Sequence, residues 1–243
     1  MKIEEYIKNS LKKKPLHFTL IDPDKQEPLR AGELARIAAD AGSDAIMVGG
    51  STVPSQDVVD EAVKEIKKNT DLPVILFPSG ANLLSKYADA LFFMSLLNSR
   101  NLDYVIREHV KGAHFVKHSG IEPISMGYVI VEPGMTAGRQ GEADLIRKDD
   151  IQTAVGYALA SQYLGMNFFY LEAGSGAPES VPNKMIKEVK ENIDIPLIVG
   201  GGIRNAKTAR EKIHAGADII VTGTIVEKDG VKEDLETMIK TIK

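Results

Sequence analysis

Short apolar runs alternate with amphipathic patterns along almost the whole chain. The runs are rich in β-branched and aromatic residues, and continuous apolar runs of this length are typical of strands buried on both faces. Eight such runs occupy residues 16–21, 45–48, 73–77, 90–94, 127–131, 167–172, 196–199 and 218–222. The pattern therefore predicts eight buried strands.

Helical patterns lie between most of these runs. Apolar residues recur at helical spacing before Gly42 and within 58–66 and 151–159. Gly165 is suited to closing the last of these helices, and Asn205 to capping a helix over 206–215. Eight strands that alternate with helices favour one α/β domain over 1–243, a parallel (β/α)8 TIM barrel. The competing doubly wound open sheet would usually have its glycine-rich phosphate loop after the first strand, but here glycines follow the last three.

Two connections depart from a regular strand–helix alternation. Residues 78–89 are at the lower limit for a crossover with a full helix and include a proline and a glycine, so we expect a shortened or non-helical connection between the third and fourth strands. Residues 133–148 form a long, charged, glycine-containing segment after the fifth strand. Loops of that length in compact domains are often lids or binding loops.

Charge and composition exclude several classes of protein. The 243 residues carry a formal net charge of −4, which argues against nucleic acid as a partner because such binding usually needs a basic face. The chain has no cysteine, so disulfides, thiolate zinc sites and a cysteine nucleophile are excluded. We find no signal peptide and no apolar run long enough to span a membrane. We therefore expect a soluble, cytoplasmic protein.

Glycines gather at the ends of the last three predicted strands. The segments read Tyr170-Leu171-Glu172-Ala173-Gly174-Ser175-Gly176, then Gly200-Gly201-Gly202, then Thr222-Gly223-Thr224. Glycine lets the backbone approach a ligand closely and expose N–H donors, and barrels of this type commonly bind phosphate after the last two strands. Three clusters on consecutive strands are hard to explain as ordinary turns, so we predict a phosphate-ester site.

Glu172 lies at the end of an otherwise apolar strand, beside the predicted phosphate site. It could face the barrel mouth and bind or deprotonate a substrate hydroxyl, or it could simply turn to solvent. Tyr170 would place a phenol near the same ligand, or it could be an ordinary core tyrosine, because alternate strand residues face opposite sides. Both are candidate site residues.

Asp22 and Ser51 follow the first and second predicted strands. Hard oxygen ligands of this kind suit Mg²⁺, which needs only one or two protein groups when phosphates and waters complete its shell. The Asp-Pro-Asp sequence is also an ordinary turn, so spacing alone leaves the metal site open. A zinc site is not expected, because His114 and His118 lack both the glutamate of a zinc hydrolase helix and a third ligand.

Methionine and aromatic residues are concentrated near the fourth and fifth strands, among them Phe93, Met94, Met126 and Tyr128. Most of this volume is needed for a barrel core. A surplus beside a shortened connection could also line a groove for a long hydrocarbon, and the pattern does not decide between these two interpretations.

The same motifs resemble the geranylgeranylglyceryl phosphate synthase family, which includes the bacterial heptaprenylglyceryl phosphate synthases. The resemblance runs over residues 16–227, and the unbroken Phe93-Met94-Ser95-Leu96-Leu97-Asn98 string is more similar to the archaeal branch. Its other carriers are Leu20-Ile21-Asp22-Pro23, Val48-Gly49-Gly50-Ser51, Leu76-Phe77-Pro78, Gly127-Tyr128-Val129-Ile130-Val131-Glu132-Pro133-Gly134, Tyr170-Leu171-Glu172-Ala173-Gly174-Ser175-Gly176, Val199-Gly200-Gly201-Gly202-Ile203-Arg204 and Val221-Thr222-Gly223-Thr224. The family often has a second glycine after Gly134 and a tryptophan further on, where this chain has Met135 to Arg139.

The resemblance implies a prenyltransferase that joins the C3 hydroxyl of sn-glycerol 1-phosphate to geranylgeranyl diphosphate as an ether and releases diphosphate. It also implies that Tyr170 through Gly176, with Gly201, Gly202, Gly223 and Thr224, hold glycerol phosphate. Residues matching Asp22 and Ser51 bind Mg²⁺ in the family. From the chemistry of the reaction, we expect Glu172 to accept the proton of the attacking hydroxyl. A homo-oligomer and transient contact with a membrane surface are further expectations.

Three alternatives remain at this point. The first is the same reaction with another polyprenyl diphosphate, such as heptaprenyl. The second is a phosphosugar isomerase, which would need a different acid–base pair. The third is a non-catalytic barrel that binds a phosphorylated metabolite.

Overall fold

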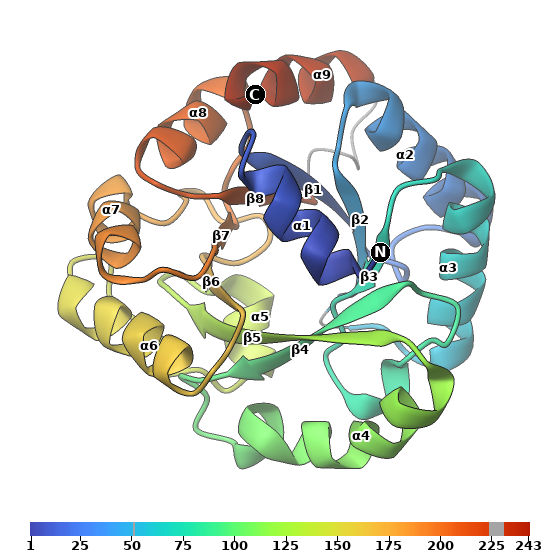
Figure 1. Ribbon diagram of the computed structural model, residues 1–243, viewed down its shortest axis with the longest axis horizontal. Helices are drawn as coiled ribbons and strands as arrows, with labels where there is room; N and C mark the ends of the chain where they lie inside the picture. Colours follow the sequence, from blue (N-terminus) through green and yellow to red (C-terminus); the bar gives the residue numbers. More distant parts are fainter. Residues whose placement is uncertain (51, 224–230) are drawn as a thin grey trace.

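A closed barrel of parallel strands forms the centre of the molecule (Figure 1). The structure is a computed structural model, and it describes residues 1–50, 52–223 and 231–243. The strands pair in sequence order, and the last also pairs with the first, which closes the sheet. They are β1 (Leu16–Ile21), β2 (Ala45–Val48), β3 (Val74–Leu76), β4 (Ala90–Leu96), β5 (Glu122–Ile130), β6 (Phe168–Glu172), β7 (Leu197–Gly200) and β8 (Ile219–Thr222). The predicted (β/α)8 barrel is confirmed.

Helices surround this barrel, and one lies across its centre in the view of Figure 1. The α-helices are α1 (Ile3–Leu11), α2 (Pro28–Ala41), α3 (Gln56–Asn69), α4 (Glu108–Ser119), α5 (Met135–Gln140), α6 (Ile151–Tyr163), α7 (Asn183–Asn192), α8 (Ala206–His214) and α9 (Val231–Ile242). A 3₁₀ turn, η1 (Ala81–Leu83), and a π-helical turn, η2 (Asp103–Arg107), complete the elements. Between β3 and β4 only η1 is found, so the predicted shortened connection is confirmed.

Helix ends follow the signals in the sequence. The side chain of Asn205 accepts the N–H of Thr208 at 2.9 Å, which caps the first turn of α8. Gly42 follows α2 with a φ of 96°, and Gly165 lies just beyond α6 with a φ of 78°. These positive φ values favour glycine and stop both helices where the sequence predicts.

The strands bury both of their faces, as their continuous apolar runs require. One cluster of buried residues fills the barrel, including Phe18 and Tyr170, and another lies between the strands and the outer helices. Helix α1 closes the amino-terminal end of the barrel, with Ile7 packed into the interior cluster. The N–H groups of Ile3 and Glu4 donate to the carboxylate of Glu122 at the start of β5, at 2.5 and 3.2 Å.

A buried polar cluster lies at the seam where β1 meets β8. Nδ1 of His17 lies 2.9 Å from Oγ of Ser43, and its Nε2 lies 2.9 Å from Oγ1 of Thr222. Oγ of Ser43 is also 2.7 Å from Oγ1 of Thr19. Burial lowers the pKa of His17 to about 3, so this imidazole is neutral at physiological pH. The cluster thus joins the barrel's first and last strands without a charge.

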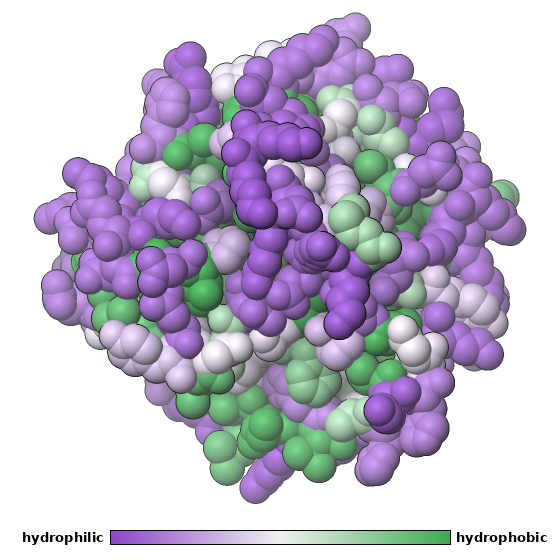
Figure 2. Space-filling model, viewed as in Figure 1, coloured by the Kyte–Doolittle hydropathy of each residue, from purple (hydrophilic) through white to green (hydrophobic). Residues whose placement is uncertain are grey.

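The face over α1 is mostly hydrophilic, whereas apolar residues gather toward the edge where α4 lies (Figure 2). Leu102, Ile106 and Val110 are exposed along η2 and α4. Among the helices of the described residues, none combines the length and the apolar character that crossing a bilayer requires.

Candidate active site

A cavity of about 260 Å³ opens at the carboxyl ends of the strands. Every strand contributes to its lining, either through its own residues or through the loop that follows it, as β2 does with Gly50. The polar part of this lining includes Asp22, Lys25, Ser79, Gln140, Tyr170, Glu172, Ser175, Gly176, Gly201, Gly202, Arg204, Thr222 and Gly223. The segments that the sequence singled out after β1, β6, β7 and β8 therefore meet in one place.

The glycine-rich segments form one wall of this cavity. Ser175, Gly176, Gly201, Gly202 and Gly223 all line it. Glycine-rich backbone of this kind can expose N–H donors to an anion, and α8 begins shortly after the β7 segment.

Three other predicted site residues lie behind this wall. Leu171, Ala173 and Gly174 are absent from the lining that the described residues form. Leu171 is fully buried between the barrel and the outer helices, because its neighbour Tyr170 faces the interior. The side chains of Leu171 and Ala173 therefore do not face the cavity.

Gly201 has no room for a side chain. A Cβ atom here would overlap Oε1 of Glu172 and would lie 2.6 Å from the backbone N of Gly174, and the φ of Gly201 is +79°. Both constraints favour glycine. At the ends of β6 and β7, the backbone of Gly201 therefore packs directly against the carboxylate of Glu172.

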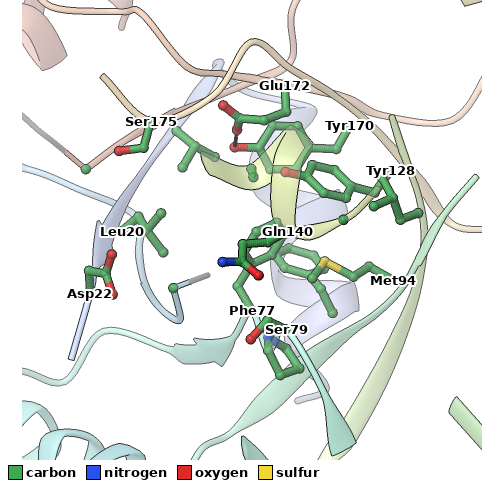
Figure 3. Close-up of a pocket in the computed structure, with 18 of the residues that line it drawn as sticks. Leu20, Asp22, Phe77, Ser79, Met94, Tyr128, Gln140, Tyr170, Glu172 and Ser175 are labelled. Carbon is green, nitrogen blue, oxygen red and sulfur yellow. Dashed lines mark hydrogen bonds between the residues drawn. The ribbon is translucent and has the colours of Figure 1, made fainter. Parts of the chain in front are cut away.

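Glu172 is held in place from two sides (Figure 3). Oη of Tyr170 donates to its Oε2 at 2.7 Å, and the N–H of Gly174 donates to its Oε1 at 2.6 Å. Burial raises the pKa of the Glu172 carboxyl, and these two hydrogen bonds oppose part of that shift. The carboxyl is 7% exposed and lines the cavity, so it does not turn to bulk solvent. A raised pKa in a cleft is typical of a proton-transfer group.

Asp22 lies across the cavity from Glu172 (Figure 3). Its Oδ2 is 3.3 Å from Nζ of Lys25, whereas its Oδ1 is buried with no hydrogen-bond partner among the described residues. A Cβ at Gly50 would overlap this Oδ1, so the β2 loop approaches the carboxylate closely. Burial raises the pKa of Asp22 to about 7, an effect that Asp24 adds to and Lys25 opposes.

A carboxylate with one buried, unpartnered oxygen suits a hard cation. Mg²⁺ often takes a single protein carboxylate together with phosphate oxygens and water. Within the part of the chain that the structure describes, no group of three or more histidine or acidic side chains could hold a metal by itself. Ser51 and Thr224, which the sequence also predicts to be site residues, fall outside the described residues.

The remaining wall is apolar and aromatic. The rings of Phe77, Tyr128 and Tyr170 contact one another at centroid distances of 5.2 to 5.7 Å. Met94 continues this wall, and Phe93 packs edge-on against His109 at 4.6 Å. The cavity therefore has one polar and one apolar half.

The 133–148 segment forms a fixed wall of the site. The buried amide of Asn98 donates to the carbonyls of Ile130 and Asp144 at 2.9 and 2.8 Å, which ties the segment to β5. Ala137 and Gln140 of α5 and Gly141, the residue that caps it, line the cavity at the i, i+3, i+4 spacing of one helix face. The sequence does not single out Gln140, because a six-residue helix leaves too weak a pattern.

Known proteins resemble the chain over its whole length. Residues 8–243 match the PcrB family. A geranylgeranylglyceryl phosphate synthase of Thermococcus sibiricus is 55% identical, with 100% of this chain and 96% of that protein covered. One from Pyrococcus horikoshii is 53% identical over 100% and 95% of the two chains. The crystal structure of (S)-3-O-geranylgeranylglyceryl phosphate synthase from Thermoplasma acidophilum, in complex with sn-glycerol-1-phosphate, is 47% identical with a TM-score of 0.98, over 100% and 99% of the chains.

Proposed function

Because the chain belongs to the PcrB family, we propose that it is a prenyltransferase that makes the ether bond between sn-glycerol 1-phosphate and geranylgeranyl diphosphate. The C3 hydroxyl oxygen of the acceptor bonds to C1 of the prenyl chain. The bond from C1 to the diphosphate oxygen breaks, and diphosphate leaves with that electron pair. One observation carries the proposal: a single cavity combines a glycine-rich wall, a buried carboxyl, a second carboxyl and an apolar wall.

The glycine-rich wall is proposed to hold the phosphate of the acceptor. Ser175, Gly176, Gly201, Gly202 and Gly223 line it, and Thr224 is included from the sequence alone. Leu171, Ala173 and Gly174 support these positions through the backbone, as the hydrogen bond from Gly174 to Glu172 illustrates. Holding the acceptor in a fixed position lowers the entropy cost of bringing two substrates together.

Glu172 is proposed to accept the proton of the C3 hydroxyl as the ether bond forms. Its raised pKa brings a carboxylate closer to the proton affinity that general-base catalysis needs at neutral pH. Tyr170 donates a hydrogen bond to Oε2, and the N–H of Gly174 donates one to Oε1. The two bonds together fix the orientation of the carboxylate. Tyr170 thus acts as a positioning residue for the base.

Asp22, together with Ser51, is proposed to hold Mg²⁺. The unpartnered Oδ1 of Asp22 fits this role, and the charged form of the carboxylate would be favoured by the cation. When bound there, Mg²⁺ neutralises the charge that develops on departing diphosphate. The carboxylate of Asp22 would place the diphosphate end of the donor opposite Glu172.

The apolar wall is proposed to bind the prenyl chain and keep water from the reactive carbon. Phe77 and Met94 lie along it (Figure 3), and burial of each methylene of the chain contributes about 0.8 kcal/mol. A longer polyprenyl donor would use the same wall, so the assay must compare donors of different length.

The direct test is an assay with purified protein, Mg²⁺, sn-glycerol 1-phosphate and a panel of C15, C20 and C35 diphosphates. We expect the ether product with C20 as the preferred donor and loss of turnover after chelation of Mg²⁺. Preference for the C35 diphosphate would show that the reaction is as proposed but that its natural donor is a longer polyprenyl diphosphate. Saturable binding of glycerol phosphate with no diphosphate released from any donor would identify a non-catalytic binding barrel.

We further propose a cytoplasmic homo-oligomer with one domain over 1–243, which relies on the family resemblance. Light scattering on the purified chain gives its mass directly, and a monomer at micromolar concentration would contradict the assembly.

A further inference from the structure

Lys212 is a buried cation that the proposed reaction does not use. It lies on α8, next to α7 in the ring of helices (Figure 1), and is only 6% exposed. Its Nζ donates to the carbonyl of Val181 at 2.8 Å and to Oδ1 of Asn183 at 2.7 Å. Among the residues that the structure describes, no carboxylate lies within salt-bridge distance of this ammonium. Burying such a charge without a counter-ion costs free energy, so its position needs a reason.

The two acceptors of Lys212 lie where the loop that carries part of the glycine-rich wall meets α7. This β6–α7 loop, residues 173–182, begins directly after Glu172 and contains Ser175 and Gly176. Its last part is anchored by Val181, whose side chain is fully buried in the outer core. Lys212 therefore holds the end of the loop in place, next to the first residue of α7.

A second cation holds the middle of the same loop. Nη2 of Arg204 donates to the carbonyls of Gly176 and Ala177, at 2.5 and 2.9 Å. Lys212 and Arg204 together bind three of the loop's carbonyl oxygens from the α8 side. A carbonyl oxygen that accepts from one of these cations points toward that cation. It is therefore turned away from a bound phosphate, whose negative oxygens would repel it.

The adjacent backbone leaves the loop little freedom to adjust. A Cβ at Gly202 would lie 2.6 Å from the carbonyl carbon of Glu179, and its φ is +69°. Because the β7 segment packs directly on the β6–α7 loop, a shift at Val181 would move both parts of the phosphate wall.

We propose that Lys212 is a positioning residue for glycerol phosphate: it holds the β6–α7 loop so that its N–H groups, and not its carbonyls, face the anion. This inference rests on the proposed function of the cavity. Lys212 touches neither substrate and acts through the backbone of residues 176–181. Its removal should weaken phosphate binding specifically, whereas a residue that only stabilises the fold would affect both substrates or neither.

The test is calorimetric titration of the full chain with sn-glycerol 1-phosphate, combined with steady-state kinetics for both substrates. Lys212→Met keeps the length of the side chain and removes both hydrogen bonds. We expect the Kd for glycerol phosphate to rise about tenfold, with the KM for geranylgeranyl diphosphate changed less than about twofold. Asn183→Ala keeps the ammonium and its bond to Val181, and we expect a rise of about threefold.

Lys190→Met is the matched control. Lys190 lies on the neighbouring helix α7, and its Nζ donates to Asp218 at 2.7 Å, just before β8 begins at the opposite end of the barrel. We expect this variant to lose thermal stability while its Kd for glycerol phosphate stays within about twofold of the wild type.

The outcomes separate the inference from the function on which it rests. If the wild type binds glycerol phosphate and Lys212→Met binds it equally well, the positioning role is wrong. An equal loss in Lys190→Met, or an equal rise in both KM values, would also overturn it. If Lys212→Met does not fold, Asn183→Ala decides by the same criteria. Absence of glycerol phosphate binding in the wild type would instead contradict the proposed function.

Discussion

The two halves of the cavity differ in the part of the chain that forms them. At the ends of β6, β7 and β8 the surface is mostly backbone, with Gly176, Gly201 and Gly202 at positive φ. Across the cavity, along β3 and β4, it is made of side chains such as Phe77 and Met94. The first half can present a fixed array of N–H donors to an anion, while the second offers volume and apolar area to a hydrocarbon.

This difference implies two kinds of response to mutation. A backbone surface has no spare space, so one added methyl group displaces neighbouring atoms at once. A side-chain surface can lose or gain a few methylenes and repack, at a cost that rises gradually. The following substitutions test whether the two halves act in these distinct ways.

The largest effect is expected for Glu172→Gln, which keeps the shape of the side chain that we propose as the proton acceptor. An amide cannot accept the hydroxyl proton, so we expect kcat to fall about 1,000-fold while the Kd for glycerol phosphate changes little. Rapid-quench kinetics and calorimetry measure the two quantities, with the exposed Glu191→Gln on α7 as control. Turnover equal to that of the wild type would remove Glu172 from proton transfer.

Gly201→Ala is expected to reduce glycerol phosphate affinity about 100-fold, because its Cβ overlaps the Glu172 carboxylate and its φ is unfavourable for alanine. Gly156→Ala in α6 is the matched control, since no atom lies within 4 Å of the Cβ it would gain. Calorimetric Kd values for both variants decide the matter. Tight binding by Gly201→Ala would show that the backbone half tolerates change.

Met94→Ala is expected to act on the other half alone. The loss of part of the apolar wall should raise the KM for geranylgeranyl diphosphate about tenfold and leave glycerol phosphate binding unchanged. Met238→Ala removes a fully buried methionine of α9 outside the cavity and controls for loss of stability. Equal changes for both substrates in Met94→Ala would contradict the division into two halves.

The smallest effect at neutral pH is expected outside the cavity, for His17→Gln at the seam where β1 meets β8. The folded pKa of His17 is about 3 and its ordinary value is 6.5, so the unfolded state binds more protons between these pH values. The unfolding free energy of the wild type should therefore contain a contribution that is complete above pH 6.5 and falls by about 1.4 kcal/mol per pH unit below it.

Chemical denaturation from about pH 4 to 7 measures this slope. His17→Gln should lower the slope between about pH 4 and 6 by that amount. Identical slopes in the wild type and His17→Gln would show that His17 takes up no proton on unfolding.

Local patterns in the sequence were sufficient to predict most of the barrel. The predicted runs 16–21 and 45–48 coincide with β1 and β2, because strands buried on both faces must be apolar throughout. The run 127–131 is only the end of β5, which starts at Glu122. Glu122-Pro123 resembles a turn, and its place in the sheet depends on pairing with β4 and on the N–H groups of α1, which are contacts distant in sequence.

The candidate site was predictable where residue type alone implies its surroundings. Glycines at three consecutive strand ends, with a glutamate beside them, indicate a backbone that approaches a ligand, because turns alone do not require that grouping. The structure brings Ser175, Gly201 and Glu172 to one cavity. Lys212 was not predictable, because one lysine in a polar helix resembles every solvated lysine until the neighbouring helix is in place.

The seal that α1 makes beneath the barrel restricts how molecules enter and leave. The side chain of Ile7 packs into the barrel interior, and the N–H groups of Ile3 and Glu4 donate to the carboxylate of Glu122. The amino-terminal end of the barrel is therefore closed by α1. Under the proposed function, the substrates therefore do not enter through the amino-terminal end of the barrel. Under the same proposal, a prenylated product that stays in the cavity would block the next acceptor, so we expect product release to limit turnover.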